Sequence, residues 1–233
     1  MIQVLTYWNE IAQATLFLGR HNLPKHRSAE KNWDLYHLCQ IIDPLPRHAK
    51  IIDLGCGGLD TLKFLHALSF QNLTGVDLNI PLLDRLQQLA RMWKQKNLKK
   101  PFKLSRQDLT KTCFPDASYD FAACISVIEH GVNIDRFLQE SARLLKSGGI
   151  LFVTADYWQE SIDTSDVSGQ FHLAWNILSQ KDIERILQVA AQYQLQPLVS
   201  SPIPPCQDKC VVWNHKEYTF ISLVFRKTDG NNK

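Results

Sequence analysis

Apolar and polar positions from residue 50 onward form blocks of two kinds, which differ in their period. Short continuous apolar runs occur in the segments KIIDLG, NLTGVDLN, PFKLSRQDL, YDFAACISV and GILFVTADY, and such runs predict buried β-strands. Apolar residues recur at helical spacing in the intervening segments LDTLKFLHAL, IPLLDRLQQLARMWKQ and NIDRFLQESARLLK. This alternation predicts an α/β fold with a mostly parallel sheet that carries helices on both faces.

The two ends of the chain do not follow this alternation. Residues 1 to about 47 are predicted to be helical, with a polar and basic loop between two helices, and residues 158–177 are predicted to be a long loop. A helix with Ser179 as its N-cap follows, and then the strand-like segments LQPLVSS and YTFISLVFR. We expect a single domain with a helical cap over residues 1–48, a ligand-binding core over 49–156, and a C-terminal part over 157–233.

Composition and charge narrow the function only slightly. The chain of 233 residues has a net charge of +3 and 45% hydrophobic residues, which is too weakly basic to indicate a nucleic-acid-binding protein. No apolar run reaches the roughly 20 residues that span a bilayer, and the first residues do not resemble a signal peptide. The six scattered cysteines are typical of reduced thiols. We therefore expect a cytoplasmic protein without a membrane segment.

The first strand of the core ends in a glycine-rich segment, IIDLGCGGLD, over residues 51–60. In an open parallel sheet, ligands bind beyond the carboxyl ends of the strands, where a glycine-rich turn lets the backbone approach them closely. Dinucleotides and S-adenosylmethionine both bind to this kind of turn. The dinucleotide pattern G-x-G-x-x-G would need a glycine at position 60, but Asp60 stands there and would repel a pyrophosphate.

Acidic residues follow or precede the strand ends in the positions that a nucleoside ligand needs. Asp53 lies two residues before the first glycine, where a carboxylate can meet an ammonium group. Asp77 ends the second strand and is placed for ribose hydroxyls, and Asp108 ends the third strand within reach of an adenine edge.

Five segments, in this order, resemble class I S-adenosylmethionine-dependent methyltransferases, in particular those similar to methyltransferase type 11. The segments are DLGCGG, GVDLN, RQDL, CISVIEH and RLLKSGGILFVT. The resemblance covers about residues 50–155. It implies a Rossmann-like fold with a seven-stranded sheet whose last strand, near residues 218–226, is antiparallel. It also implies methyl transfer from S-adenosylmethionine, with S-adenosylhomocysteine as product, to oxygen or nitrogen of a small-molecule or sugar-type acceptor.

The resemblance assigns roles to individual residues. Gly55 and Gly57 would let the backbone pass the methionine part of the cofactor, and the family's third glycine falls at Leu59, whereas this chain has Gly58. The cofactor-binding residues that the resemblance implies are Asp53, Gly55, Cys56, Gly57, Asp77, Leu78, Asp108, Leu109 and Ser126.

An oxygen acceptor must lose its proton during methyl transfer, and His and carboxylate side chains are the usual bases. The sequence offers His130 in the segment SVIEH and His172 in the long loop as candidate catalytic bases. The aromatic side chains of Trp158 and Trp175 either contact the acceptor or pack a lid over the pocket.

Several alternatives remain open from the sequence. The basic segment RMWKQKNLKKPFKLSR would suit RNA, so an RNA or protein methyltransferase is one alternative, although the low net charge disfavours it. A nicotinamide oxidoreductase is disfavoured by Asp60, and a non-catalytic protein that retains the cofactor pocket is the third alternative. Cys206, Cys210 and His215 have a weak metal-like spacing without a fourth ligand, so we expect no metal.

Overall fold

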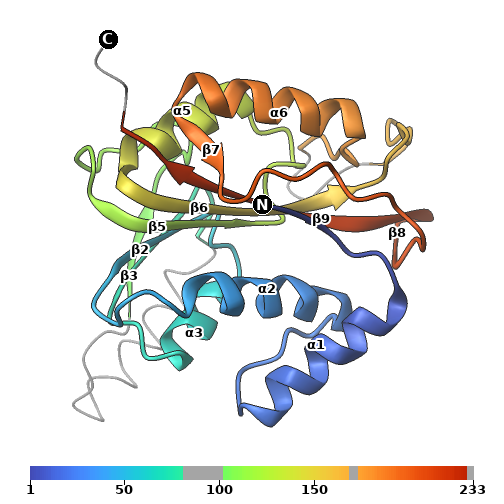
Figure 1. Cartoon of the computed structure of the whole chain (residues 1–233), viewed down its shortest axis with the longest axis horizontal. Helices are drawn as coiled ribbons and strands as arrows, with labels where there is room; N and C mark the ends of the chain where they lie inside the picture. Colours follow the sequence, from blue (N-terminus) through green and yellow to red (C-terminus); the bar gives the residue numbers. More distant parts are fainter. Residues whose placement is uncertain (81–101, 168–172, 230–233) are drawn as a thin grey trace.

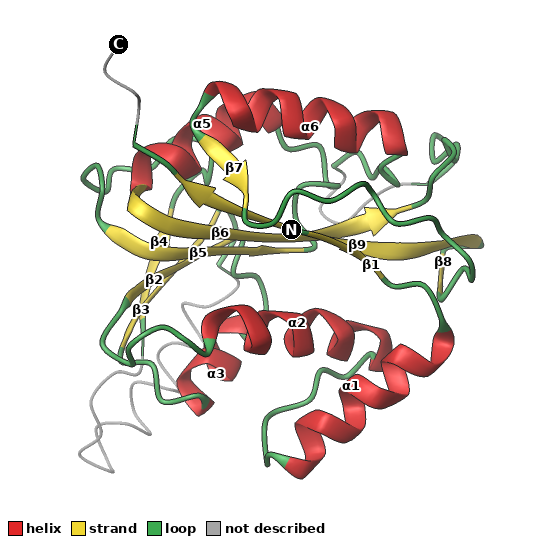
Figure 2. Cartoon of the chain, viewed as in Figure 1, coloured by secondary structure: helices red, strands yellow, loops and turns green. Residues whose placement is uncertain are grey.

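The computed structural model describes residues 1–80, 102–167 and 173–229. A twisted sheet lies between two layers of helices (Figures 1 and 2). Helices α1 (Trp8–Arg20), α2 (Asn32–Ile42) and α3 (Asp60–Ala67) cover one face, and α5 (Ile134–Leu144) and α6 (Gln180–Gln192) cover the other. A short 3₁₀ turn, Ala29–Lys31, leads into α2. The predicted helix after residue 80 lies outside the described residues.

The centre of the sheet is parallel, as the alternation of strands and helices predicts. Strands lie in the order β1-β9-β6-β5-β2-β3-β4, and the five strands from β6 to β4 are parallel. Their bounds are β2 Lys50–Leu54, β3 Asn72–Asp77, β4 Lys103–Arg106, β5 Tyr119–Ile125 and β6 Leu145–Tyr157. Strand β9 (Lys216–Lys227) pairs antiparallel with β6, which confirms the predicted antiparallel last strand.

Within the described residues the sheet has nine strands, so the predicted number of seven is wrong. Three strands of three residues each pair antiparallel with different parts of β9: β1 (Ile2–Val4), β7 (Leu195–Pro197) and β8 (Val211–Trp213). Because β9 is 12 residues long, these short strands cover backbone groups that would otherwise form an open edge. The first residues of the chain therefore begin with a strand rather than with the predicted helix.

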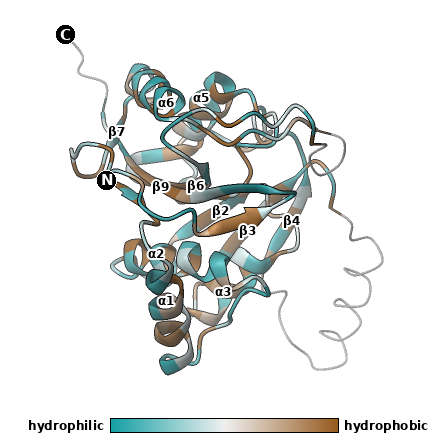
Figure 3. Ribbon diagram, turned by 90° about the vertical axis from the view of Figure 1, so that its right-hand side faces the viewer, coloured by the Kyte–Doolittle hydropathy of each residue, from teal (hydrophilic) through white to brown (hydrophobic). Residues whose placement is uncertain are grey.

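Buried apolar side chains fill the space on both faces of the sheet. One cluster packs α5 and α6 against β5, β6 and β9, and the other packs α2 and α3 against β2 and β5. Figure 3 shows hydrophobic residues along the central strands. This packing holds the carboxyl ends of β2, β3, β5 and β6 at one edge, and β2 lies where the strand order reverses between β3 and β5. A crevice at that edge is the usual ligand site of such folds.

The predicted N-cap of the C-terminal helix is confirmed. The Ser179 side chain accepts a hydrogen bond from the Asp182 amide, and the Asp182 carboxylate accepts one from the Ser179 amide. Among the described helices, none has the length and apolar character needed to cross a membrane.

Candidate functional site

The glycine-rich turn after β2 is held against the end of β3. The amides of Gly55 and Cys56 both donate to the Val76 carbonyl, at 2.8 and 2.9 Å. Gly55 has φ +89°, and a Cβ placed on it would lie 2.5 Å from Cγ2 of Val127, in the loop after β5. Only glycine tolerates this positive φ and also avoids the clash. The turn can therefore lie directly against the loop after β5.

Leu59 takes the place of the family's third glycine, and its backbone keeps a conformation that favours glycine. Its φ is +67° and its ψ is +18°. A left-handed conformation costs a non-glycine residue about 1 to 2 kcal/mol, but the Leu59 side chain is buried in the core cluster beneath α3, which offsets this cost. The sequence therefore departs from the family pattern here, and Leu59 adopts the backbone conformation that a glycine favours.

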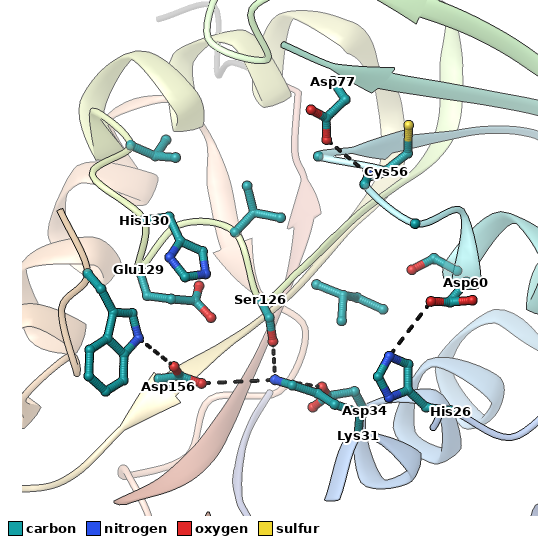
Figure 4. Close-up of a pocket in the computed structure, with 18 of the residues that line it drawn as sticks. His26, Lys31, Asp34, Cys56, Asp60, Asp77, Ser126, Glu129, His130 and Asp156 are labelled. Carbon is teal, nitrogen blue, oxygen red and sulfur yellow. Dashed lines mark hydrogen bonds and ion pairs between the residues drawn. The ribbon is translucent and has the colours of Figure 1, made fainter. Parts of the chain in front are cut away.

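Asp77 joins the turn to the end of β3. Its Oδ2 accepts a 2.9 Å hydrogen bond from the Gly57 amide, and its Oδ1 accepts one of 2.8 Å from the Asn79 amide. These bonds fix the carboxylate at the mouth of the crevice (Figure 4). Each oxygen keeps further lone-pair capacity for a ligand hydroxyl.

Asp53 lies beneath the turn and does not line the pocket. Its side chain is buried, and Oδ2 has no hydrogen-bond partner among the described residues. Burial, with a contribution from nearby Asp77, raises the pKa of Asp53 to about 8. A buried, unpartnered carboxyl group below a nucleoside site fits a ligand that brings an ammonium group above it.

A pocket of about 630 Å³ extends from this turn toward the end of β6, a size that suits a nucleoside ligand together with a second molecule. Most of the predicted cofactor residues and one predicted base line it: Gly55, Cys56, Gly57, Asp77, Leu78, Leu109, Ser126 and His130. Asp108 does not line the pocket, and its Oδ1 accepts 2.8 Å hydrogen bonds from the amide and the hydroxyl of Thr110. The other predicted base, His172, lies outside the described residues. The ligand-binding roles stay predictions.

The inner half of the pocket contains a group of charged residues that we call the acid cluster: Lys31, Asp34, Glu129 and Asp156 (Figure 4). The Lys31 ammonium donates to the Ser126 hydroxyl and lies 3.5 Å from Asp34 Oδ2 and 3.9 Å from Asp156 Oδ1. Burial opposes its charge, but the surrounding carboxylates outweigh burial and raise the pKa of Lys31. Lys31 is therefore a cation at neutral pH and not a base.

The carboxyl groups of the cluster are poorly satisfied. Both oxygens of Glu129, and both of Asp34, have no hydrogen-bond partner among the described residues. Burial raises the pKa of Asp34 to about 6, and burial together with Asp156 raises the pKa of Glu129 well above its usual range. Asp156 differs, because its Oδ2 accepts a 2.8 Å hydrogen bond from the Trp175 indole.

His130 lies beside the acid cluster, and its ring points into the pocket (Figure 4). Its Nδ1 is buried without a hydrogen-bond partner among the described residues. Burial lowers the pKa of His130, and Lys31 adds to this effect while Asp156 opposes it. The ring is therefore neutral at neutral pH and can accept a proton.

Aromatic side chains close the pocket beyond the acid cluster. Trp175 is buried and packs edge-on against Trp213 and Tyr218, at centroid distances of 4.6 and 5.7 Å. All three line the pocket, whereas Trp158 does not and packs against the core. Trp175 thus both lines the pocket and packs its wall, so the two interpretations of this residue are compatible.

Sequence reasoning missed Lys31, Asp34, Trp213 and Tyr218. The first two lie on the turn and helix of the N-terminal segment, and the last two lie on the β8–β9 hairpin. The only sequence signal of Lys31 and Asp34 is that they are a polar pair at the start of an otherwise mostly apolar helix. Such pairs are too common to indicate a site. Cys206 and Cys210 are free thiols, and the described residues contain no group of three or more His, Cys, Asp or Glu arranged to hold a metal ion.

Comparison with known proteins identifies a methyltransferase domain. The model of the family described as "Methyltransferase domain" matches residues 52–153, which include the strands β2 to β5 and the turns at the crevice. The structural neighbours of the chain are S-adenosylmethionine-dependent class I methyltransferases. The predicted family, the predicted Rossmann-like methyltransferase fold and the predicted cofactor class are confirmed.

Individual methyltransferases resemble the chain only distantly in sequence. A "Ubiquinone biosynthesis O-methyltransferase" of Pelagibacter ubique is 26% identical over 144 residues, which are 61% of this chain and 57% of the relative. The chain thus spans somewhat more than half the length of the curated relatives that it matches first.

Two solved structures show how widely the fold is used. Geranyl diphosphate C-methyltransferase from Streptomyces coelicolor A3(2) has a TM-score of 0.65 at 15% identity, covering 88% of this chain and 86% of that chain. The [4+2]-cyclase SpnF has a TM-score of 0.63 at 15% identity, covering 96% and 95%. The fold therefore serves more than one reaction, and the reaction must be argued from the site.

Proposed function

We propose that the chain transfers the methyl group of S-adenosylmethionine to an oxygen or nitrogen atom of a small-molecule or sugar-type acceptor. One observation carries the proposal: the turn held by the Gly57–Asp77 hydrogen bond opens into a pocket that continues to polar and titratable groups. Relatives named as an O-methyltransferase and a C-methyltransferase support methyl transfer to small molecules.

The residues that line the outer half of the pocket would hold the cofactor. Asp77 has lone pairs left for the two ribose hydroxyls, and Leu78 and Leu109 lie where an adenine ring would pack. Gly57 has φ +34° and leaves open space where a side chain would otherwise stand, because a Cβ there meets nothing nearer than 4.0 Å. A methionine chain can therefore pass close to this backbone.

S-adenosylmethionine supplies an activated methyl group, whose bond to sulfur breaks with its electron pair left on sulfur as the bond to the acceptor forms. The protein must place the acceptor in line and exclude water. Neutral His130, with its unpartnered Nδ1, is the described residue best suited to take the proton of an acceptor hydroxyl. His172 stays a second candidate for that role.

Other functions are less well supported. Residues 91–101 of the basic segment lie outside the described residues, so nothing new favours RNA as acceptor. A cytoplasmic location stays a prediction.

Calorimetric titration with S-adenosylhomocysteine tests the proposal, with NAD as the competing ligand. We expect micromolar binding of S-adenosylhomocysteine, loss of that binding in Asp77→Ala, and no binding of NAD. Asp43→Asn, which changes an exposed carboxylate paired with Arg47 at the surface, is the matched control and should bind as the wild type does. Binding of NAD alone would contradict the proposal.

A further inference from the structure

The acid cluster brings together carboxyl groups from three separate elements. Asp34 lies on α2, Glu129 follows β5, and Asp156 lies near the end of β6. Asp34 is 0% exposed, Glu129 1% and Asp156 5%, yet all three line the pocket. The described lining residues supply a single ammonium group, that of Lys31, so the acids outnumber the cation.

The unpartnered oxygens of Asp34 and Glu129 require hydrogen-bond donors. A buried carboxyl group without partners is costly. The described chain offers no hydrogen bond to Glu129 or to Asp34 Oδ1, and only the Lys31 ammonium, 3.5 Å away, faces Asp34 Oδ2. An ionised carboxylate only accepts hydrogen bonds, whereas a protonated carboxyl group also donates one. A molecule that fills this part of the pocket must therefore bring several groups that both donate and accept hydrogen bonds.

Three classes of acceptor are unsuited to this part of the pocket, each for a different reason. An apolar acceptor such as an isoprenoid or a sterol would remove water from the acids without replacing its hydrogen bonds. An anionic acceptor would meet a surplus of carboxyl groups. An amine would bind well but would be held as an ammonium ion, which has no lone pair to attack the methyl group.

Resting on the proposed function, we propose that the acceptor is a neutral polyhydroxylated molecule of the carbohydrate class and that a hydroxyl oxygen receives the methyl group. Its other hydroxyls donate to Asp34 and Glu129, and the Lys31 ammonium donates to its oxygens. In the transfer itself, one hydroxyl oxygen forms the bond to the methyl carbon and its proton passes to His130, while the sulfonium becomes a neutral thioether.

The walls of the pocket fit this class of molecule. Trp213 is half-buried and lines the pocket next to Trp175, so an aromatic surface lies beside a set of hydrogen-bonding groups. Sugars have apolar C–H faces and polar edges, and amphipathic aromatic side chains suit such ligands. The Lys31 ammonium is fixed by Ser126 and lies 3.6 Å from the centre of the Phe220 ring, so it is preorganised to donate.

Saturation-transfer NMR on the protein loaded with S-adenosylhomocysteine tests the inference. The panel contains neutral methyl glycosides and short oligosaccharides, with phenols, isoprenoid alcohols and primary amines as the matched classes, all at millimolar concentration. The same panel is then incubated with the protein and methyl-labelled S-adenosylmethionine. We expect binding and label transfer for one or more glycosides, and no label transfer to the other classes.

Asp34→Asn and Glu129→Gln keep the side-chain shape but turn an acceptor oxygen into a donor group. We expect each to lower kcat/KM for the glycoside about tenfold, because the amide nitrogen cannot accept the hydrogen bond of a glycoside hydroxyl and leaves it unsatisfied, with unchanged affinity for S-adenosylhomocysteine. Asp43→Asn is the control and should leave both unchanged. Thermal melting of each variant verifies that it is folded.

The outcomes separate the inference from the proposed function. Failure of S-adenosylhomocysteine to bind would overturn the proposed function and the inference together. Binding of S-adenosylhomocysteine with label transfer only to phenols, isoprenoids or amines would overturn the inference alone. So would binding of S-adenosylhomocysteine without any glycoside binding, or glycoside transfer that both variants retain.

Discussion

The amide of Gly57 donates a 2.9 Å hydrogen bond to Oδ2 of Asp77, a residue 20 positions further along the chain. This bond links the glycine-rich turn after β2 to the end of β3. The carboxylate proposed to hold the ribose therefore also holds the backbone that the methionine part of the ligand must pass. The two halves of the cofactor site are coupled through one side chain.

This coupling predicts different effects for two substitutions of Asp77. Asp77→Asn keeps an oxygen that can accept a hydrogen bond from the amide of Gly57 or of Asn79. Asp77→Ala removes both of these bonds, together with the carboxylate proposed to bind the ribose hydroxyls. We expect Asp77→Ala to abolish measurable binding of S-adenosylhomocysteine and Asp77→Asn to weaken it by about tenfold to a hundredfold, which corresponds to one charged hydrogen bond. Titration calorimetry measures both. If both variants lost the same amount of affinity for S-adenosylhomocysteine, the charge of Asp77, and not its hydrogen bond to Gly57, would determine binding.

We predict that a side chain at position 55 clashes with Val127 and that shortening Val127 relieves the clash. Gly55→Ala places a methyl group 2.5 Å from Cγ2 of Val127 at a φ of +89°. We expect a loss of about 3 kcal/mol in the free energy of unfolding, from left-handed strain plus overpacking, together with weaker cofactor binding. In Gly55→Ala with Val127→Ala, the two changes should be coupled by at least about 1 kcal/mol.

Gly148→Ala is the matched control for this experiment. Gly148 has φ +77°, but no atom lies within 4 Å of a Cβ built on it. Only the strain of about 1 to 2 kcal/mol should appear, without any effect on cofactor affinity. Urea unfolding at equilibrium measures five proteins: the wild type, Gly55→Ala, Val127→Ala, the double variant and Gly148→Ala. A Gly55→Ala loss no larger than that of Gly148→Ala would contradict the predicted clash.

His130 predicts a pH profile for methyl transfer to a hydroxyl. The pKa of His130 lies below its ordinary value of 6.5 because the ring is buried, and only the neutral ring can take a proton. The logarithm of kcat/KM should therefore rise with pH on the acid side and level off by about pH 6.5. His130→Gln should lower kcat by about a hundredfold, leave the affinity for S-adenosylhomocysteine unchanged, and lose the His130 part of the acid limb. Retention of the full acid limb in the variant would remove His130 as the base.

Local patterns predicted most of the fold and the outer half of the site. Strands β2, β3 and β5 and the second half of β6 consist mainly of consecutive buried residues, and the turn after β2 follows from its glycines. The short strands β1 and β8 were not predicted, because three residues are too few to establish a period. Their formation depends on the long partner β9, which is distant from β1 in sequence.

The inner half of the pocket could not be predicted for the same reason. Lys31 and Ser126 are 95 residues apart in the sequence. They meet because the 3₁₀ turn before α2, which ends with Lys31, lies over the end of β5, which Ser126 follows. Asp108 stays a predicted ligand residue, although it does not line the pocket and its Oδ1 is bonded to Thr110. A motif identifies the residues of one loop, whereas the acceptor side depends on contacts between distant elements.

Asp53 predicts a pH dependence of stability in the unliganded protein. Its pKa is about 8 when folded and 3.8 by its ordinary value, so between these pH values the folded protein binds a proton that the unfolded chain has lost. The Asp53 contribution to the free energy of unfolding should therefore fall as pH rises, by up to about 1.4 kcal/mol per pH unit. Urea unfolding at pH 5 and pH 8 should show this fall for the wild type relative to Asp53→Asn. Parallel pH dependences of the two proteins would contradict it.

The same raised pKa of Asp53 predicts that cofactor binding releases a proton. An ammonium group bound above the turn favours the ionised carboxylate, so Asp53 should lose its proton when S-adenosylhomocysteine binds near pH 7. The calorimetric enthalpy should then depend on the ionisation enthalpy of the buffer. 5′-Methylthioadenosine, which lacks the amino acid part, is the control ligand and should bind without this dependence, as should S-adenosylhomocysteine with Asp53→Asn. Equal proton release for both ligands in the wild type would place its source at another group than Asp53.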